Sequence, residues 1–187
     1  MPAFEWTLEK YHDAIEKGVL TELDRVELLL GQIIAKVPVG ELHADITSQL
    51  VEFFVNRFGL AHKYRIQNPV TLPNNSEPEP DFAVVVHRAY NKQTGHPGPD
   101  DILLLIEVSD STLVFDQTQK ARAYALAGIS EYWIINLPDH QVELHLNPNP
   151  EKGNYRTRSI HEAGTTFASP FCGEVVVNEI IPEETPQ

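Results

Sequence analysis

The chain has 187 residues, of which 42% are hydrophobic, so its composition allows one domain with a buried core. Its 27 acidic and 14 basic residues give a net charge of −13, which counts against passive nucleic-acid binding through a broadly basic surface. The single cysteine, Cys172, excludes an intrachain disulfide and a zinc site built on cysteines. The N-terminus lacks a signal-peptide pattern and the longest apolar run is residues 102–106, so we expect a cytoplasmic protein without a membrane span.

The first segments predict a helix followed by a hairpin. Residues 7–17 fit a helix, because Thr7 can cap its start and Gly18 can end it. Within residues 25–35, two short apolar runs flank Gly31, which predicts a β-hairpin.

The next region predicts a long helix and two strands. Residues 41–58 carry apolar side chains at helical spacing, so we expect the main amphipathic helix there. Residues 63–72 are typical of a strand. Residues 73–80 hold prolines and asparagines and should be irregular. Residues 81–86 are continuously apolar, which favours a strand buried on both faces.

The second half alternates strand and helix patterns. We expect a loop, a very apolar strand, a helix and another strand at residues 90–101, 102–109, 116–127 and 131–136. Residues 142–146 alternate in polarity and predict a half-exposed strand, which should pair with residues 155–160.

This order predicts an α/β fold with a central mixed β-sheet flanked by helices. The strand, helix and strand of residues 102–136 favour neighbouring parallel strands, and the preceding strands are close enough in sequence to be antiparallel. We expect a single domain over residues 1–181 and an acidic, flexible tail over residues 182–187.

Two acids stand at strand ends, Asp81 at the start of one apolar run and Glu107 at the end of another. Two such carboxylates on neighbouring strands can hold one hard divalent cation. Pro80-Asp81 alone is a common turn sequence, and Glu107 could be a strand-end acid that reaches solvent. Burial of Glu107 would require a partner or a metal, because an unpaired buried carboxylate is costly.

Lys120 and Ser109 could belong to the same site. Lys120 follows the Glu107 strand by one helical turn, so it can lean back over the strand end and steady a charged transition state. Asp116 lies four residues earlier, however, and as a helix N-cap it could form an ordinary surface ion pair with Lys120. Ser109 shares a strand face with Glu107, where it could contact substrate or act as a turn residue.

Further candidates leave two interpretations open. Glu27 could be a site acid or an outward-facing strand residue, and the pattern favours neither. His43 could contact a phosphate, although a lone histidine near a helix start is more often structural. Basic residues that could line a local groove lie at 62–65, 87–88 and 156–158, where solvated surface is the commoner interpretation.

Together these residues resemble the PD-(D/E)XK nuclease superfamily, and more closely a bacterial group described as restriction endonucleases of about this length. The motifs that carry the resemblance are Val26-Glu-Leu-Leu-Leu-Gly31, His43, Pro80-Asp81, Glu107-Val-Ser-Asp-Ser-Thr112, Asp116-Gln-Thr-Gln-Lys120, Tyr124 and Gly128-Ile-Ser-Glu-Tyr-Trp133. They cover most of the chain.

The resemblance implies a restriction-endonuclease-like core in which Asp81 and Glu107 bind Mg²⁺, which Mn²⁺ can replace. The usual lysine follows the second acid by two positions, where this chain has Ser109, and Lys120 on the following helix would take its place. Glu27 is carried over as an additional active-site acid.

The leading hypothesis is a Mg²⁺-dependent DNA endonuclease that hydrolyses phosphodiester bonds with metal-activated water. We expect a homodimer, because cutting both strands needs two sites. One alternative is a catalytically inactive nuclease-fold binding module, which the acidic charge and Ser109 would favour. Another is an interaction protein that only self-assembles.

Overall fold

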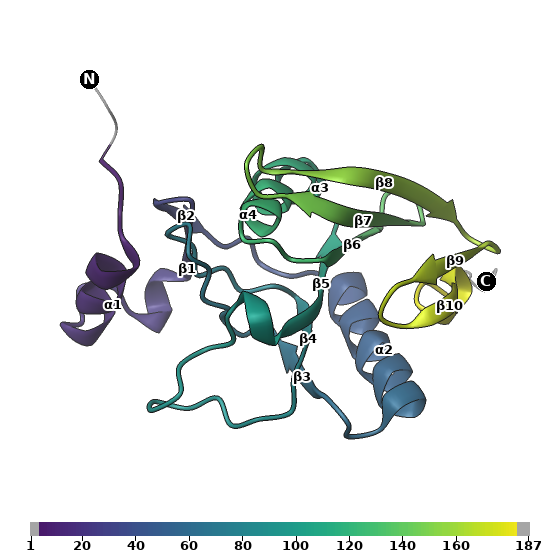
Figure 1. The fold of residues 1–187 in the computed structure, drawn as a ribbon, viewed down its shortest axis with the longest axis horizontal. Helices are drawn as coiled ribbons and strands as arrows, with labels where there is room; N and C mark the ends of the chain where they lie inside the picture. Colours follow the sequence, from purple (N-terminus) through teal and green to yellow (C-terminus); the bar gives the residue numbers. More distant parts are fainter. Residues whose placement is uncertain (1–3, 183–187) are drawn as a thin grey trace.

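A six-stranded mixed sheet in the order β3-β4-β5-β6-β7-β8 forms the centre of the protein (Figure 1). Its strands are β3 (Lys63–Ile66), β4 (Phe82–Val85), β5 (Ile102–Ser109), β6 (Glu131–Asn136), β7 (Gln141–Asn149) and β8 (Asn154–Glu162). Strands β5 and β6 are parallel, and every other neighbouring pair in this sheet is antiparallel. The computed structural model describes residues 4–182, so nearly all of the predicted tail lies outside the described residues.

Helices and two small hairpins surround this sheet. The α-helices are α1 (Leu8–Glu16), α2 (Glu41–Phe58), α3 (Leu113–Phe115) and α4 (Ala121–Leu126), and the hairpin strands are β1 (Val26–Leu29), β2 (Gln32–Ala35), β9 (Thr166–Ser169) and β10 (Gly173–Val176). Figure 1 shows α1 and the β1–β2 hairpin at one end of the molecule and the β9–β10 hairpin at the other. No helix in the described part of the chain is long and apolar enough to cross a membrane.

Side-chain alternation along the strands divides the core into two clusters. Helix α2 packs Leu50 and Phe54 against one face of the sheet, which presents Phe82, Ile106 and Trp133. The other face contacts α4 and presents a second set of buried side chains, which includes Ala83, Leu105, Tyr124, Tyr132 and Ile134. Because successive strand residues point to opposite faces, Glu107 and Ser109 lie on the α4 face with Leu105.

The predicted helices and strands are confirmed over much of the chain. Helix α2 covers the predicted residues, and Thr7 accepts a hydrogen bond from the Lys10 amide at the start of α1. The first hairpin turns at Leu30 and Gly31, which have φ values of 50° and 74° and are typical of a tight hairpin turn. Strand β4 is buried on both faces, as the apolar run predicted.

The structure differs from the prediction at two strands. The strand expected over residues 63–72 ends at Ile66, because Gln67 has a φ of 49° and Pro69 follows two residues later. The strand expected at 142–146 is not half exposed, since residues 142–145 are all buried between α4 and the α2-side core. The β9–β10 hairpin was not predicted.

The helix expected over residues 116–127 begins earlier and is irregular. It starts as α3 at Leu113, passes through a π-helical turn over Asp116–Lys120 and ends as α4. Asp116 is therefore not an N-cap but lies inside the helical segment, where it is 4% exposed. A π-helical turn inside a helix is often found at a functional site.

Candidate active site at the ends of β4 and β5

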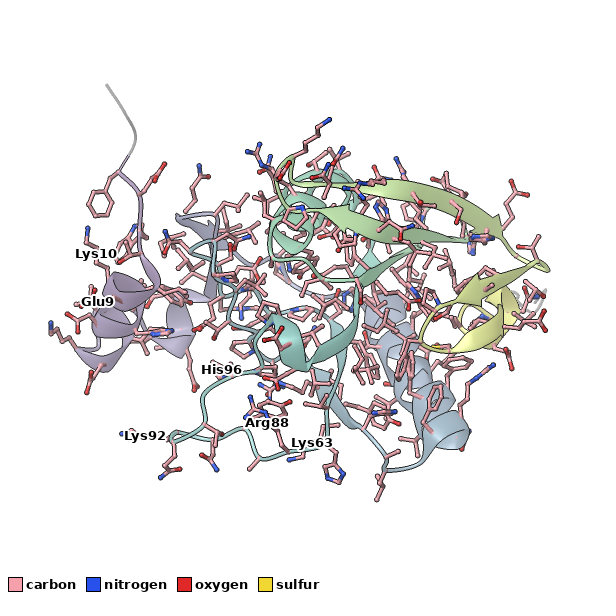
Figure 2. The ribbon with its side chains drawn as sticks, viewed as in Figure 1. Glu9, Lys10, Lys63, Arg88, Lys92 and His96 are labelled. Carbon is pink, nitrogen blue, oxygen red and sulfur yellow. The ribbon has the colours of Figure 1, made fainter. Side chains whose placement is uncertain are left out.

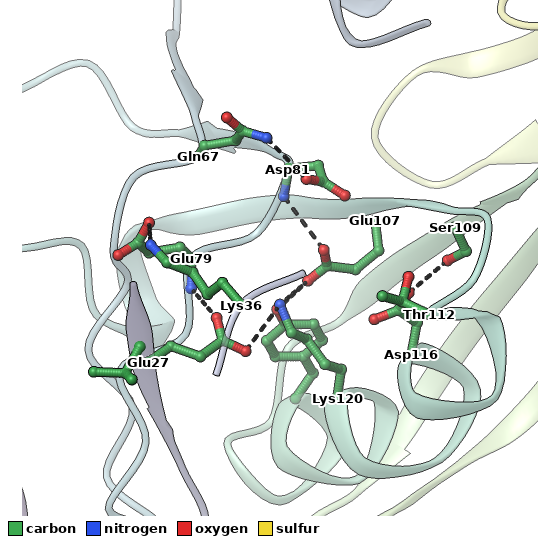
Figure 3. A network of polar contacts seen from close by, with 12 residues as sticks. Glu27, Lys36, Gln67, Glu79, Asp81, Glu107, Ser109, Thr112, Asp116 and Lys120 are labelled. Carbon is green, nitrogen blue, oxygen red and sulfur yellow. Dashed lines mark hydrogen bonds and ion pairs between the residues drawn. The ribbon is translucent and has the colours of Figure 1, made fainter. Parts of the chain in front are cut away.

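The register of β4 and β5 brings two acids together. Phe82 pairs with Ile106 in an antiparallel ladder, so Asp81 and Glu107 are the next residues across from each other. The Asp81 amide donates to Glu107 Oε2 at 3.3 Å, and the Val108 amide donates to Asp81 Oδ2 at 2.9 Å. Each carboxylate thus accepts from a backbone amide of the other acid's segment, and Figure 3 shows the bond from the Asp81 amide to Glu107.

Glu107 is a buried carboxylate, and its other oxygen has two strong donors. It is 2% exposed, and its Oε1 accepts from Lys120 Nζ at 3.0 Å and from the Tyr124 hydroxyl at 2.6 Å. Lys120 and Tyr124 are one helical turn apart, which places both on the helix face that covers Glu107.

Glu27 reaches the same lysine from the β1–β2 hairpin. Its Oε1 lies 3.3 Å from Lys120 Nζ, and its Oε2 accepts from the Glu79 amide at 3.0 Å. Glu27 is 3% exposed, so the structure places it inside the site rather than at an outward-facing strand position.

A second polar cluster holds the helix that carries Lys120. Asp116 Oδ2 accepts from the Ser109 and Thr112 hydroxyls, each at 2.7 Å. The surface pair suggested for Asp116 and Lys120 is therefore wrong, because both side chains are buried and neither bonds the other. Ser109 is fully buried, and its hydroxyl fastens the strand end to the helix instead of facing the cleft.

Asp81 is more accessible than the other acids and contacts His43 at the start of α2. His43 Nε2 lies 3.0 Å from Asp81 Oδ2, and the two side chains are 11% and 15% exposed. Gln67, just after β3, donates to Asp81 Oδ1 at 3.4 Å, which is a long contact. The histidine thus helps fix the orientation of the Asp81 carboxylate.

At Glu107, Lys120 and Asp81, burial shifts the pKa in one direction and the neighbouring opposite charges shift it in the other. Burial raises the pKa of Glu107 well above its usual value, although Lys120 opposes the change. Burial alone would lower the pKa of Lys120, but Glu107 and Glu27 outweigh it and raise that pKa. Burial would likewise raise the pKa of Asp81, but His43, Lys120 and the Val108 amide lower it, so this carboxyl remains ionised near neutral pH.

These side chains lie in a cleft with a volume of about 430 Å³. Its walls come from the β1–β2 hairpin and the segment after it, the start of α2 and the loop after β5. Asp81, Glu107 and Lys120 line it together with Glu27 and His43. Residues far apart in sequence therefore contribute to one concave surface, which is the usual form of a ligand site.

The donors in the cleft fit a hard divalent cation. Asp81 Oδ1 and Glu107 Oε2 each have one long hydrogen bond, at 3.4 and 3.3 Å. The other oxygen of each carboxylate has two closer partners. Among residues 4–182, no group of three or more His, Cys, Asp or Glu side chains could enclose a metal ion. Two carboxylates suit Mg²⁺, which usually keeps several waters and takes further oxygens from phosphate.

The sequence did not assign two contributors, Tyr124 and Asp116, a role in this site. Tyr124 donates to Glu107, and its place four residues after Lys120 on the same helix face was an available signal. The role of Asp116 depends on Ser109 and Thr112, and the local sequence favoured a capping role instead.

Comparisons with known proteins agree with this architecture. A family model described as "Uma2: Putative restriction endonuclease" matches residues 8–176. A solved structure described as a putative nuclease belonging to DUF820, from Anabaena variabilis ATCC 29413, superposes with a TM-score of 0.68 at 18% identity, over 93% of this chain and 96% of that one. At this identity the match shows a shared fold, which confirms the predicted α/β core. No curated protein matches the chain.

Proposed function

Because the chain belongs to the Uma2 family of restriction-endonuclease-like proteins, we propose that it is a divalent-metal-dependent DNA endonuclease with its active site in this cleft. The observation that carries the proposal is the meeting of Asp81, Glu107 and Lys120 from three separate elements in one concave surface. Carboxylates and an amine in this arrangement suit phosphodiester hydrolysis, in which negative charge develops on phosphate oxygens.

In this proposal Asp81 and Glu107 hold a Mg²⁺ or Mn²⁺ ion. The ion, when bound, would lower the pKa of a coordinated water and neutralise charge on the phosphate. His43 and the Val108 amide keep the Asp81 carboxylate ionised and in a fixed orientation, in which it would bind the ion.

Lys120 would supply the positive charge beside the reacting phosphate. Glu107 and Glu27 keep its amine protonated and fix its position, so the charge needs no rearrangement when the transition state forms. Tyr124 and the Asp116 cluster act through Glu107 and the helix, and we assign them positioning roles.

The test is nicking of supercoiled plasmid with Mg²⁺ or Mn²⁺ by the wild type and Asp81→Asn. Asp81→Asn keeps the shape of the side chain but removes its charge, and we expect cleavage to fall by about a hundredfold or more. Asp100→Asn is the matched control, because Asp100 is an exposed acid outside the cleft, and it should cleave like the wild type.

Full cleavage by Asp81→Asn would refute the assignment of this site. Metal binding by a folded wild type without turnover would favour the alternative of an inactive nuclease-fold binding protein. We further propose a homodimer, which light scattering of the purified protein would test, because cutting both strands calls for two such sites.

A further inference from the structure

Acidic residues are absent from two segments of this otherwise acidic chain. Residues 53–76 and 82–99 contain none of the 27 acids but five of the 14 basic residues. Those five are Arg57, Lys63, Arg65, Arg88 and Lys92. The two segments contain β3 and β4, which pair with each other at one edge of the central sheet.

Three of these basic residues surround Tyr90, and a fourth, Lys92, lies on the same loop as Tyr90. We define the Tyr90 patch as Lys63, Arg65, Arg88, Tyr90 and Lys92. The Tyr90 ring centroid lies 4.4 Å from the Arg88 guanidinium, 5.5 Å from that of Arg65 and 5.9 Å from Lys63 Nζ. Lys92 extends from the same loop, and Figure 2 shows it on the same side of the molecule as Lys63 and Arg88.

The patch keeps a net positive charge. Arg88 forms an ion pair with Asp101 at 2.5 Å. Within residues 4–182, Lys63, Arg65 and Lys92 have no carboxylate partner. The other basic candidate differs, because Arg156 and Arg158 lie on β8 at the opposite sheet edge and Arg158 is paired with buried Glu143 at 2.7 Å.

Strand β3 connects the patch to the cleft. Ile66 pairs with Phe82 and Lys63 with Val85, so Lys63 lies across from a residue four positions beyond Asp81. At about 3.3 Å per strand residue, this places Lys63 about 13 Å along the strand from Asp81. A duplex rises about 3.4 Å per base pair, so the same span corresponds to about four base pairs.

We propose that the Tyr90 patch binds the phosphate backbone of duplex DNA about four base pairs from the phosphate held in the cleft. This rests on the proposed nuclease function and adds a second DNA contact to it. Lysines on an edge strand can also prevent edge-to-edge pairing. That role does not account for Arg88 and Lys92, which lie on the loop after β4 and not on the edge strand.

The test measures binding of a short fluorescent duplex by anisotropy over a range of KCl concentrations. Ca²⁺ replaces Mg²⁺ so that binding is read separately from cleavage. The variant is Lys63→Ala/Lys92→Ala, which leaves the Arg88–Asp101 pair intact. Lys10→Ala/Lys152→Ala removes the same charge from exposed sites on α1 and on the β7–β8 turn, and is the matched control.

The plot of log K against log salt has a negative slope, and each lost phosphate contact should make that slope less steep by about 0.9. We therefore expect the patch variant to bind at least about tenfold more weakly at about 0.1 M salt, with a slope that is less steep by about 2. The control should keep the wild-type slope. Lys92→Ala alone should make the slope less steep by about 1. Because Lys92 lies on an exposed loop, misfolding would be a poor explanation of that change.

Equal losses in both double variants would overturn the proposal, because net charge and not the patch would then set affinity. No change in the patch variant, or no binding by the wild type, would also overturn it. Either result is distinct from failure of the nuclease proposal, which is read from plasmid cleavage by Asp81→Asn.

Discussion

Replacing Lys120 with methionine should destabilise the protein strongly, because it would leave two buried carboxylates without their cation. Glu107 and Glu27 are 2% and 3% exposed, and both contact Lys120 Nζ. Removing one partner of a buried ion pair costs about 3–5 kcal/mol. Tyr124 and two backbone amides still donate to the acids, so we expect the lower end, about 3 kcal/mol.

For a chain of this size, that loss corresponds to a melting temperature lower by about 6–12 °C. Thermal unfolding followed by circular dichroism measures it. Lys36→Met is the control, because Lys36 pairs with Glu79 at a site where the side chains are 29% and 22% exposed. That partly exposed pair should contribute about 1 kcal/mol or less.

The double variant Glu107→Gln/Lys120→Met tests the reason for the loss. It restores the charge balance of the site, so its loss should be smaller than the sum of the two single losses by at least about 1 kcal/mol. The reasoning is refuted if Lys120→Met melts like Lys36→Met, or if the two single losses simply add.

Three other changes test neighbouring parts of the structure. Tyr124→Phe removes a hydroxyl that donates to the buried Glu107 carboxylate, and urea unfolding should show a loss of about 1.5–3 kcal/mol. Burial alone would raise the pKa of Glu143, but the neighbouring His145 imidazole, hydrogen bonds from Asn136 and Gln117, and the Arg158 guanidinium lower it from 4.5 to about 2. The stabilisation by Glu143 is therefore present above pH 4.5 and lost as the pH falls toward 2, so the wild type should lose more stability in that window than Glu143→Gln does. Gly31→Ala should lower the melting temperature, because φ is +74° there and a Cβ would lie 3.2 Å from the Trp6 carbonyl oxygen.

The parts of the fold that local patterns determine could be predicted from the sequence. Helix α2 has apolar residues at regular spacing and Gly59 at its end, and the first hairpin has a glycine where φ is positive. The apolar runs of β4 and β5 mark buried strands, and their ends mark where Asp81 and Glu107 lie.

The remaining features depend on contacts between distant residues. An acid four positions before a lysine is a sound local signal for a surface ion pair, yet burial against β5 gave Asp116 and Lys120 different partners. Asp116 also accepts from the Ser109 hydroxyl, and this contact between strand β5 and the helical segment is one that no helical periodicity encodes. Strands β9 and β10 have four residues each and, unlike β4, no apolar run along their whole length to mark them.

The position of Glu27 in the β1–β2 hairpin has a consequence for how the protein acquires its cleft. Glu27 leaves the ribosome well before the lysine that balances its charge, because that lysine lies on a helix much later in the chain. Contacts between residues so far apart in sequence form slowly, because the intervening chain must first be ordered. A nascent or truncated chain that stops before the helix therefore has the acids of the cleft without their cation, and the arrangement is completed only after the helix has been synthesised.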